Sequence, residues 1–406
     1  MKKIIIAGAG FAGVRVALDL YRQLPEANIV VINKTPFHCY HPDLYEVATA
    51  ILPKEQKIDF KNLRGTVNIP LETVFKDKKV ELMIDTVAGV DLENNMVATQ
   101  NSGTIEYDFL VLCLGSTTSY LGVEGAEEFS HCLKTAEDAL NIRNDLEELV
   151  LRNKGGFSIV IAGGGFTGVE AAGQLTGFLD NLSRKYGNKR ADITIIEASD
   201  APLAGMPTWS QKLALERLKK LNVRLFLSHR IEKVEEGRIY CDDKERINFD
   251  YLIWTAGVLG VALKEKVRGT PFTKKQRILA LPDMSLEKFP NVFVIGDLVE
   301  CNDQRRGCPV PSAAWAAIGQ GKIAAKNILA RVENRQTQDY VPPSSTFVVP
   351  LDGKYALSNF AGLKITGILG WILKRMIALK YFLSILSFYE AFTIWRKGVK
   401  IYLAND

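Results

Sequence analysis

The sequence of 406 residues has few of the residue types that bind metals or form disulfides. It contains six cysteines, none of them in a CxxC pair, and four histidines, of which only His38 and His41 lie close together. Scattered cysteines are typical of a reducing compartment. The lack of a close pair argues against enzymes that work through a redox-active dithiol. We also predict no metal site, because the two histidines have no acidic or thiolate partner at zinc-ligand spacing.

Long uncharged hydrophobic runs are lacking too. No stretch approaches the ~18 apolar residues that a membrane-spanning helix requires. The apolar run at the N-terminus is interrupted by glycines, reaches Arg15 and offers no cleavage site of the signal-peptide type. We therefore predict that the protein stays inside the cell. The net charge of +5 is too small to indicate a nucleic-acid partner.

The chain does contain a strand–turn–helix pattern at its start. Residues 2–7 are predicted as a buried strand, 14–23 as a helix and 29–32 as a second strand, and Gly8-Ala9-Gly10-Phe11-Ala12-Gly13 forms the turn between the first strand and the helix. This is the GxGxxG fingerprint of a dinucleotide-binding βαβ unit. Its glycines permit the tight turn, the approach of a pyrophosphate and the packing of helix on strand. The helix N-terminus favours the phosphate anion.

The same pattern recurs later in the chain. A predicted strand at 158–162 leads into Gly163-Gly164-Gly165-Phe166-Thr167-Gly168, and a helix at 169–182, a polar insert at 183–190 and a strand at 192–196 follow. One glycine motif is weak evidence of a nucleotide site. Two motifs, each between a strand and a helix, predict an α/β protein with two Rossmann-like dinucleotide-binding domains.

The residue that follows the second strand differs between the two motifs. Glu197 closes the later one, and a carboxylate there accepts a hydrogen bond from a ribose 2′-hydroxyl and repels a 2′-phosphate, so it predicts NADH over NADPH. Asn33 stands at the equivalent position of the first motif and lacks the charge, so its ribose contact should be weaker. Basic side chains of the polar insert could restore NADPH binding or form a solvated loop; they are Arg184, Lys185, Lys189 and Arg190.

Other predicted elements surround these motifs. Strands are expected within 80–90, at 109–114 before Gly115, at 251–255 before Ala256-Gly257, and at 292–295 before Gly296-Asp297. Thr135 is expected to cap a helix over 135–151. A second, alanine-rich helix is expected over 311–330.

The last part of the chain is basic and rich in large apolar residues. After a proline-containing linker at 341–345, the basic side chains are Lys364, Lys374, Arg375, Lys380, Arg396, Lys397 and Lys400. Lys380, Ser384 and Ser387 recur at i, i+4 and i+7, which predicts one polar stripe on an otherwise apolar helix. This pattern favours a helix lying in the membrane interface with basic residues toward anionic headgroups. The alternative is a helix pair packed on the body or at a dimer interface.

Together these motifs resemble the two-dinucleotide-binding-domain flavoproteins, and most closely the type II (non-proton-pumping) NADH:quinone oxidoreductases. The likeness covers residues 3–330 and is looser beyond them. The segments that carry it are HCYHPDLYEVA (38–48), YDFLV (107–111), LGS (114–116), LKT (133–135), EDA (137–139), WTAGV (254–258) and Gly296-Asp297.

The resemblance implies an FAD-binding domain over 1–115 and 268–332, an NADH-binding domain over 116–267 and a membrane-association region over 340–406. The FAD contacts that it implies are Gly8, Gly10, Phe11, Ala12, Gly13, Asn33, Lys34, Tyr45, Gly115 and Asp297. The NADH contacts are Gly163, Gly165, Phe166, Thr167, Gly168, Glu197 and Gly257.

The family also places a glutamate just after the second glycine loop, near the flavin, and Glu170 occupies that position. The helix dipole alone would account for a carboxylate there, while a neighbouring flavin would give it a proton-relay role. The quinone helix of the family carries Ala-Gln and, four residues on, a second Gln. The corresponding positions here are Ala314, Trp315 and Gly319, with Gln320 retained, so two expected polar side chains are missing.

The expected function is an FAD-dependent enzyme that passes electrons from NADH to a membrane quinone without pumping protons, peripherally bound at the cytoplasmic face of the cell membrane. A homodimer is plausible from the family likeness. The alternatives are an NADH-dependent reductase with a non-quinone acceptor and a redox sensor that binds flavin and NADH. A sulfide:quinone oxidoreductase is disfavoured, because Cys132, Cys301 and Cys308 do not form a convincing flavin-flanking set.

Overall fold

The computed structural model describes residues 1–405 except 52–59, 154, 188–190, 243, 262, 264–266, 268–271, 306 and 344–345. Lys189 and Arg190 of the polar insert and Ser344 and Ser345 of the linker therefore lie outside the described residues. The chain divides into two compact units. The first consists of 1–39, 69–117 and 258–343, and the second of 40–68, 118–257 and 344–406.

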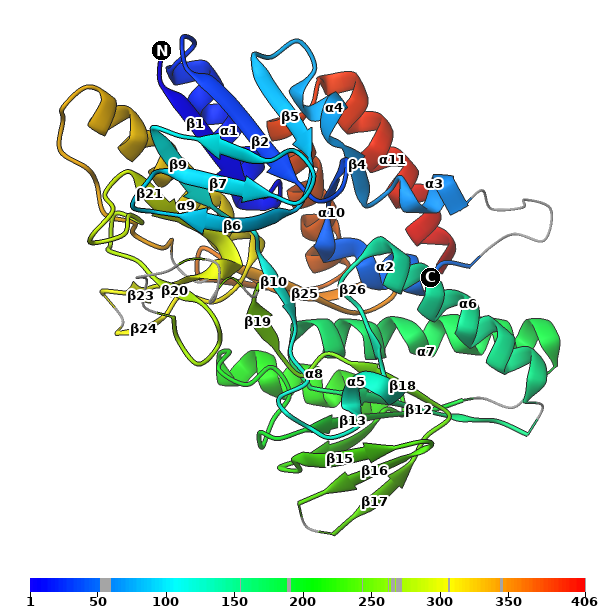
Figure 1. The fold of residues 1–406 in the computed structure, drawn as a ribbon. Helices are drawn as coiled ribbons and strands as arrows, with labels where there is room; N and C mark the ends of the chain where they lie inside the picture. Colours follow the sequence, from blue (N-terminus) through cyan, green and yellow to red (C-terminus); the bar gives the residue numbers. More distant parts are fainter. Residues whose placement is uncertain are drawn as a thin grey trace. The chain divides into compact units, whose positions relative to one another are not determined.

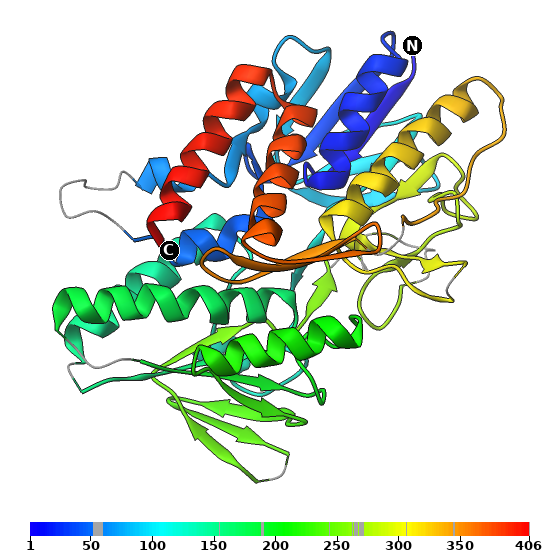
Figure 2. The ribbon, with the colours of Figure 1, turned by 180° about the vertical axis from the view of Figure 1, so that it is seen from behind.

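The first unit is built on a parallel sheet in the order β21-β9-β1-β2-β5. Its strands are β1 (Lys3–Ala7), β2 (Asn28–Asn33), β5 (Val80–Ile84), β9 (Phe109–Leu112) and β21 (Val292–Val294). The three central strands are almost entirely buried, which is the environment that apolar, β-branched runs favour. Helices α1 (Phe11–Gln23) and α9 (Ala314–Val332) pack against each other beside this sheet (Figure 2).

Smaller elements complete this unit. An antiparallel sheet is formed by β6 (Val87–Asp91), β7 (Met96–Thr99) and β8 (Thr104–Glu106). Short elements are β3 (Phe37–Cys39), β4 (Asn68–Pro70), α4 (Leu71–Phe75), β10 (Ser116–Thr118), β19 (Val258–Gly260), β20 (Ile278–Leu279), η2 (Gly296–Leu298), β22 (Val299–Glu300), β23 (Asn302–Asp303) and β24 (Cys308–Pro309).

The second unit repeats the parallel architecture in the order β11-β18-β12-β13-β14. These strands are β11 (His131–Cys132), β12 (Ser158–Ala162), β13 (Asp192–Glu197), β14 (Arg224–Leu227) and β18 (Tyr251–Trp254). Figure 1 labels β18, β12 and β13 of this sheet. The longer helices are α6 (Ala136–Arg152), α7 (Phe166–Tyr186) and α8 (Thr208–Lys220). The predicted Thr135 cap is confirmed: Thr135 and Asp138 form a reciprocal capping box at the start of α6.

This unit also contains an antiparallel sheet of β15 (Ile231–Glu235), β16 (Arg238–Cys241) and β17 (Arg246–Asn248). Its short helices are η1 (His41–Asp43), α2 (Leu44–Ala48), α3 (Phe60–Arg64) and α5 (Ala126–Phe129). The C-terminal part adds a second antiparallel sheet, β25 (Phe347–Asp352), β26 (Tyr355–Phe360) and β27 (Leu363–Gly367), and then helices α10 (Ile368–Ile385) and α11 (Phe388–Asn405).

Helix boundaries differ from the sequence-based expectation. Helices α1 and α7 begin directly after Gly10 and Gly165, the second glycines of the two GxGxxG patterns. Their first residues are Phe11 and Phe166, three residues earlier than predicted. Helix α7 also continues to Tyr186, so the predicted polar insert begins inside the helix. Helix α9 starts later than expected, at Ala314, because Ala313 is still extended.

The prediction of one polar stripe on a C-terminal helix is wrong. Helix α10 ends at Ile385, and Ser387 instead precedes α11, where its hydroxyl donates to Glu390 Oε2 at 2.8 Å. A serine followed three residues later by glutamate is a helix-start signature, so Ser387 marks a new helix and does not share a face with Lys380 and Ser384. In the part of the chain that the structure describes, no helix is both long and apolar enough to cross a membrane.

Candidate functional site

The first glycine loop connects β1 to α1 and can be built only with glycine at two of its positions. Gly8 has φ +112°, and a Cβ there would lie 2.4 Å from the Cys113 carbonyl oxygen. A Cβ on Gly13 would lie 1.9 Å from the Gly8 carbonyl oxygen. The loop is fixed at its start because the Gly8 N–H donates to the Ile32 carbonyl at 2.8 Å.

The second glycine loop, between β12 and α7, has the same construction. Gly163 has φ +102°, and its N–H donates to the Ile196 carbonyl at 2.8 Å. A Cβ on Gly168 would lie 1.9 Å from the Gly163 carbonyl oxygen. The two sequence motifs therefore fold into two equivalent strand–turn–helix sites.

The middle of each loop is open, and this is the feature that fits a pyrophosphate. Gly10 and Gly165 are the N-caps of α1 and α7 and supply no side-chain cap. A Cβ built on either would meet nothing within 4 Å. An anion can therefore approach the backbone N–H groups at both helix N-termini, where the helix dipole favours it. The residues present suit a dinucleotide in each unit.

The residue at the end of the second strand braces each loop. Asn33 Oδ1 accepts from the Ala9 N–H at 2.9 Å, and its Nδ2 donates to the Thr35 carbonyl at 2.7 Å. In the second unit, the Glu197 carboxylate accepts from the Gly164 N–H at 2.6 Å and from the Ser199 N–H at 2.8 Å. Both residues thus lie at their loops, although each already bonds to the backbone. Lys34 is exposed next to Asn33.

The basic residues of the predicted insert do not converge on the second loop. Arg184 and Lys185 lie in the last turn of α7, about 27 Å along the helix axis from its first residue at 1.5 Å per residue. There Lys185 forms an ion pair with Glu147 at 3.3 Å, and Arg184 binds the neighbouring helix residues. These two side chains are too far from the loop to hold a 2′-phosphate.

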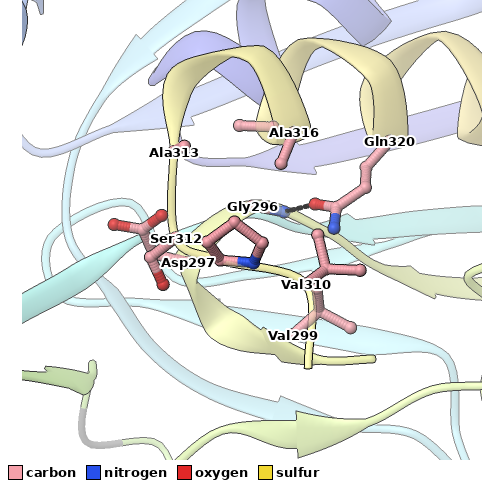
Figure 3. A pocket seen from close by; sticks show the side chains of 10 residues that line it. Gly296, Asp297, Val299, Val310, Ser312, Ala313, Ala316 and Gln320 are labelled. Atoms are coloured by element: carbon pink, nitrogen blue, oxygen red, sulfur yellow. Dashed lines mark hydrogen bonds between the residues drawn. The ribbon is translucent and has the colours of Figure 1, made fainter. Parts of the chain in front are cut away.

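Asp297 lies on a small pocket of the first unit (Figure 3). Its Oδ2 accepts from the Ser116 hydroxyl at 2.8 Å, and Ser116 follows Gly115, which has φ +79°. The pocket lies beside the N-terminus of α9 and is lined by Gly296, Asp297, Val299, Val310, Pro311, Ser312, Ala313, Ala316, Ala317 and Gln320. A polar group of a bound cofactor could donate to the Asp297 carboxylate or accept from this helix start.

Two of the residues predicted for a quinone site, Gln320 and Gly319, lie against other residues of the first unit. Gln320 is buried; its Oε1 accepts from the Gly296 N–H at 2.8 Å (Figure 3) and holds the turn that carries Asp297. A Cβ on Gly319 would lie 3.0 Å from the Tyr340 ring, so this ring takes the space of a longer side chain. Ala314 and Trp315, in the first turn of α9, are half-buried.

Tyr45 and the segment around it pack inside the second unit, against the C-terminal helix α10. Lys374 pairs with Asp43 at 3.0 Å and lies over the Tyr45 ring at 4.2 Å. Arg375 pairs with Glu46. All four charged side chains are buried. Lys374 and Arg375 therefore lie inside the second unit, and only other basic residues of the tail can face anionic headgroups as predicted.

Glu170 lies on α7 near these buried charges. Burial raises the pKa of its carboxyl well above the usual range, and the carboxylates of Asp43 and Glu46 raise it further. The helix dipole, which would favour an ionised carboxylate, does not dominate here. The direction of this pKa shift favours the protonated carboxyl over the carboxylate.

The family model of the pyridine nucleotide-disulphide oxidoreductases matches residues 2–321. The chain belongs to this family. A type II NADH:quinone oxidoreductase from Staphylococcus aureus is 28% identical over 359 residues, which are 84% of this chain and 85% of that protein. The predicted resemblance to these oxidoreductases is thereby confirmed. The chain has no CxxC pair.

Two solved structures share the fold. NDH2 from Plasmodium falciparum, solved in complex with NADH, superposes with a TM-score of 0.84 at 14% identity and covers 98% of both chains. The sulfide:quinone oxidoreductase from Aquifex aeolicus superposes with a TM-score of 0.79 at 19% identity, over 98% of this chain and 92% of that one.

The remaining predicted contacts stay predictions. Phe11, Ala12, Phe166 and Thr167 lie in the first turns of α1 and α7, and Gly257 follows β18 beside Ser119 and Leu121. Sequence reasoning missed His38, whose imidazole bonds to the first loop from within the fold. The available signal was a histidine five positions after Asn33, in a chain that has only four. Among the described residues, no cluster of three or more potential ligands could hold a metal ion.

Proposed function

We propose that this chain is an FAD-dependent NADH:quinone oxidoreductase, with FAD on the first glycine loop and NADH on the second. The observation that carries the proposal is the pair of equivalent open loops, each at a helix N-terminus and each braced by the residue after its second strand. The Staphylococcus aureus relative, a type II NADH:quinone oxidoreductase by name, supports the reaction. When bound, FAD supplies the chemistry of accepting a hydride and releasing its two electrons separately or together.

The residues of each loop have distinct tasks. The N–H groups around Gly10 and Gly165 bind a pyrophosphate, and Glu197 accepts from a ribose hydroxyl while it disfavours a 2′-phosphate. The Asp297 carboxylate, which also accepts from the Ser116 hydroxyl, offers acceptor oxygens to a polar chain in the pocket beside α9. The hydrogen bond from Gly296 to Gln320 keeps Asp297 in place.

Glu170 is the residue that we propose for proton handling. Because burial and two neighbouring carboxylates favour its protonated form, it can serve as a proton donor and recover the proton afterwards. Replacement by glutamine preserves the shape and the hydrogen-bonding groups but removes the exchangeable acid. We expect Glu170→Gln to slow quinone reduction and to flatten its pH profile, while NADH binding is unchanged.

The identity of the electron acceptor depends on the residues at the start of α9. We propose that Ala314, Trp315, Gly319 and Gln320 border the quinone site. The Tyr340 ring against Gly319 favours a second candidate, a reductase with a non-quinone acceptor, because this ring stands where a polar side chain was expected. Turnover with a short-chain quinone and with ferricyanide, in wild type and Trp315→Ala, separates the two. If the chain is a quinone reductase, the variant should lose turnover with the quinone and keep turnover with ferricyanide.

We further propose that the apolar outer surface of α10 and α11 lies on an anionic membrane surface, at the cytoplasmic face. Leu369, Phe388 and Tyr389 are 64%, 74% and 79% exposed, which is unusual for residues of this size. Lys380 and Lys400 are exposed on the same helices. Together they match an amphipathic surface helix attracted to acidic lipid.

Flotation with vesicles that contain anionic lipid tests this membrane surface. Leu369→Glu combined with Phe388→Glu should abolish flotation, whereas Leu279→Glu, a control at an exposed apolar residue of the first unit, should float as wild type does. If the double variant floats normally and the wild type is dimeric in solution, the surface covers a second copy instead. The homodimer stays a prediction until that measurement.

A further inference from the structure

Two side chains bond to the backbone of Ala9 in the first loop, one at its N–H and one at its carbonyl oxygen. Its N–H donates to Asn33 Oδ1 at 2.9 Å, and its carbonyl oxygen lies 2.9 Å from His38 Nδ1. A carbonyl oxygen can only accept, so His38 Nδ1 carries the hydrogen. The imidazole is fully buried, and the Phe11 ring packs on it edge to face at 5.1 Å between centroids.

In the second loop the equivalent residue, Gly164, is also bonded at both its N–H and its carbonyl oxygen, but by different partners. The Gly164 N–H donates to Glu197 at 2.6 Å, as Ala9 does to Asn33. The Gly164 carbonyl, however, accepts from the backbone N–H of Leu203 at 2.8 Å. The donor is therefore an imidazole that can titrate in one loop and a backbone amide that cannot in the other.

Peptide planarity links this bond to the ligand. The Ala9 carbonyl and the Gly10 N–H belong to one trans peptide and point in opposite directions. Holding the carbonyl oxygen against His38 therefore turns the Gly10 N–H to the opposite side. Gly10 adjoins open space at the start of α1, which is where an anion is favoured.

We propose that His38 is a positioning residue of the first dinucleotide loop: by donating to the Ala9 carbonyl it orients the Gly10 N–H toward the pyrophosphate of FAD. This inference rests on the proposed assignment of FAD to that loop. Burial lowers the pKa of His38 to about 4, opposed only in part by the bond to Ala9. A protonated ring would be a buried cation against Phe11, so acid should weaken the first site, while the Leu203 amide leaves the second loop without this sensitivity.

The test compares wild type, His38→Leu and His38→Asn. Asparagine keeps an N–H donor near the position of Nδ1 but does not titrate, and leucine removes the donor. FAD affinity is measured by flavin fluorescence on the apoprotein, and ADP-ribose affinity, as a probe of the second loop, by calorimetry on FAD-loaded protein.

We expect His38→Leu to raise the Kd for FAD about five- to tenfold, the effect of one lost hydrogen bond, and to leave the ADP-ribose Kd unchanged. His38→Asn should restore most of the FAD affinity. Between pH 7 and pH 4 the FAD Kd of wild type should rise about twofold relative to that of His38→Asn, because a ring with a pKa of about 4 is half protonated at the lower pH.

An unchanged FAD Kd in His38→Leu, or the same pH dependence in wild type and His38→Asn, would overturn the inference. If His38→Leu does not fold, the pH comparison between wild type and His38→Asn decides alone. A wild-type protein that binds no FAD at any pH would contradict the proposed function itself, and that outcome is distinct from a failure of His38.

Discussion

At the scale of single residues, backbone geometry explains why glycine stands at the last position of each loop. A Cβ on Gly13 or Gly168 would lie 1.9 Å from a carbonyl oxygen of its own loop. No side-chain rotamer can relieve this clash, because the backbone alone fixes the positions of the Cβ and the carbonyl oxygen. The helix would have to move away from its strand. Since the two loops belong to different units, each glycine should affect one nucleotide only.

Gly168→Ala should therefore raise the Kd for NADH about tenfold or more, as expected when a pyrophosphate loses aligned N–H donors, and should leave bound FAD in place. Gly13→Ala is the matched variant and should reverse the pattern, with loss of FAD during purification. Calorimetry and the flavin content of the purified proteins measure both effects. Equal loss of both nucleotides in both variants would contradict the assignment.

His38 also makes stability depend on pH. Its pKa is about 4 in the folded protein and about 6.5 in an unfolded chain, so the unfolded state takes up the proton first. The stabilisation is complete above about pH 6.5 and is lost as the pH falls toward 4. Between pH 7 and pH 5 the loss is about 2 kcal/mol. Urea unfolding should show it as a difference between wild type and His38→Asn, and parallel pH profiles would argue against it.

At the scale of elements, the sequence predicted the parallel strands well and the C-terminal tail poorly. A short apolar, β-branched run such as 159–162, followed by a glycine turn, favours a buried strand, and β12 covers Ser158–Ala162. In the tail, the spacing of polar residues favours one helix at the membrane over a packed helix pair, because nothing local shows that Lys374 and Arg375 pair with Asp43 and Glu46 more than 300 positions away. Partners this distant leave no periodic signal.

That buried ion-pair network should be essential to the C-terminal helices. Removing one partner leaves an uncompensated buried charge and typically costs about 3–5 kcal/mol, so Arg375→Leu should lower the free energy of unfolding by about that amount. Arg396→Leu, at an exposed position of α11, should change it by less than about 0.5 kcal/mol. Denaturant unfolding followed by tryptophan fluorescence measures both. Similar values for the two variants would show that the network does not fasten α10.

At the scale of the whole molecule, the two nucleotide loops were predictable and their supports were not. Spacing alone placed Gly8 to Gly13 and Gly163 to Gly168, because a turn of fixed length must follow a strand and start a helix. The donors that hold the loops, His38 and Leu203, come from segments outside the glycine motifs, and nothing in their spacing indicates these bonds. The space at Gly319 was likewise unreadable, since Tyr340 fills it from beyond the end of α9.

The most direct measurement is a double-mixing stopped-flow experiment on the FAD-loaded protein without oxygen. NADH is added first and a short-chain quinone second, while flavin absorbance is followed. The account predicts rapid bleaching by NADH and rapid recovery with quinone. Bleaching without recovery would mean that the acceptor is not a quinone. A flavin that NADH does not bleach would contradict electron transfer from NADH on the second loop to FAD on the first.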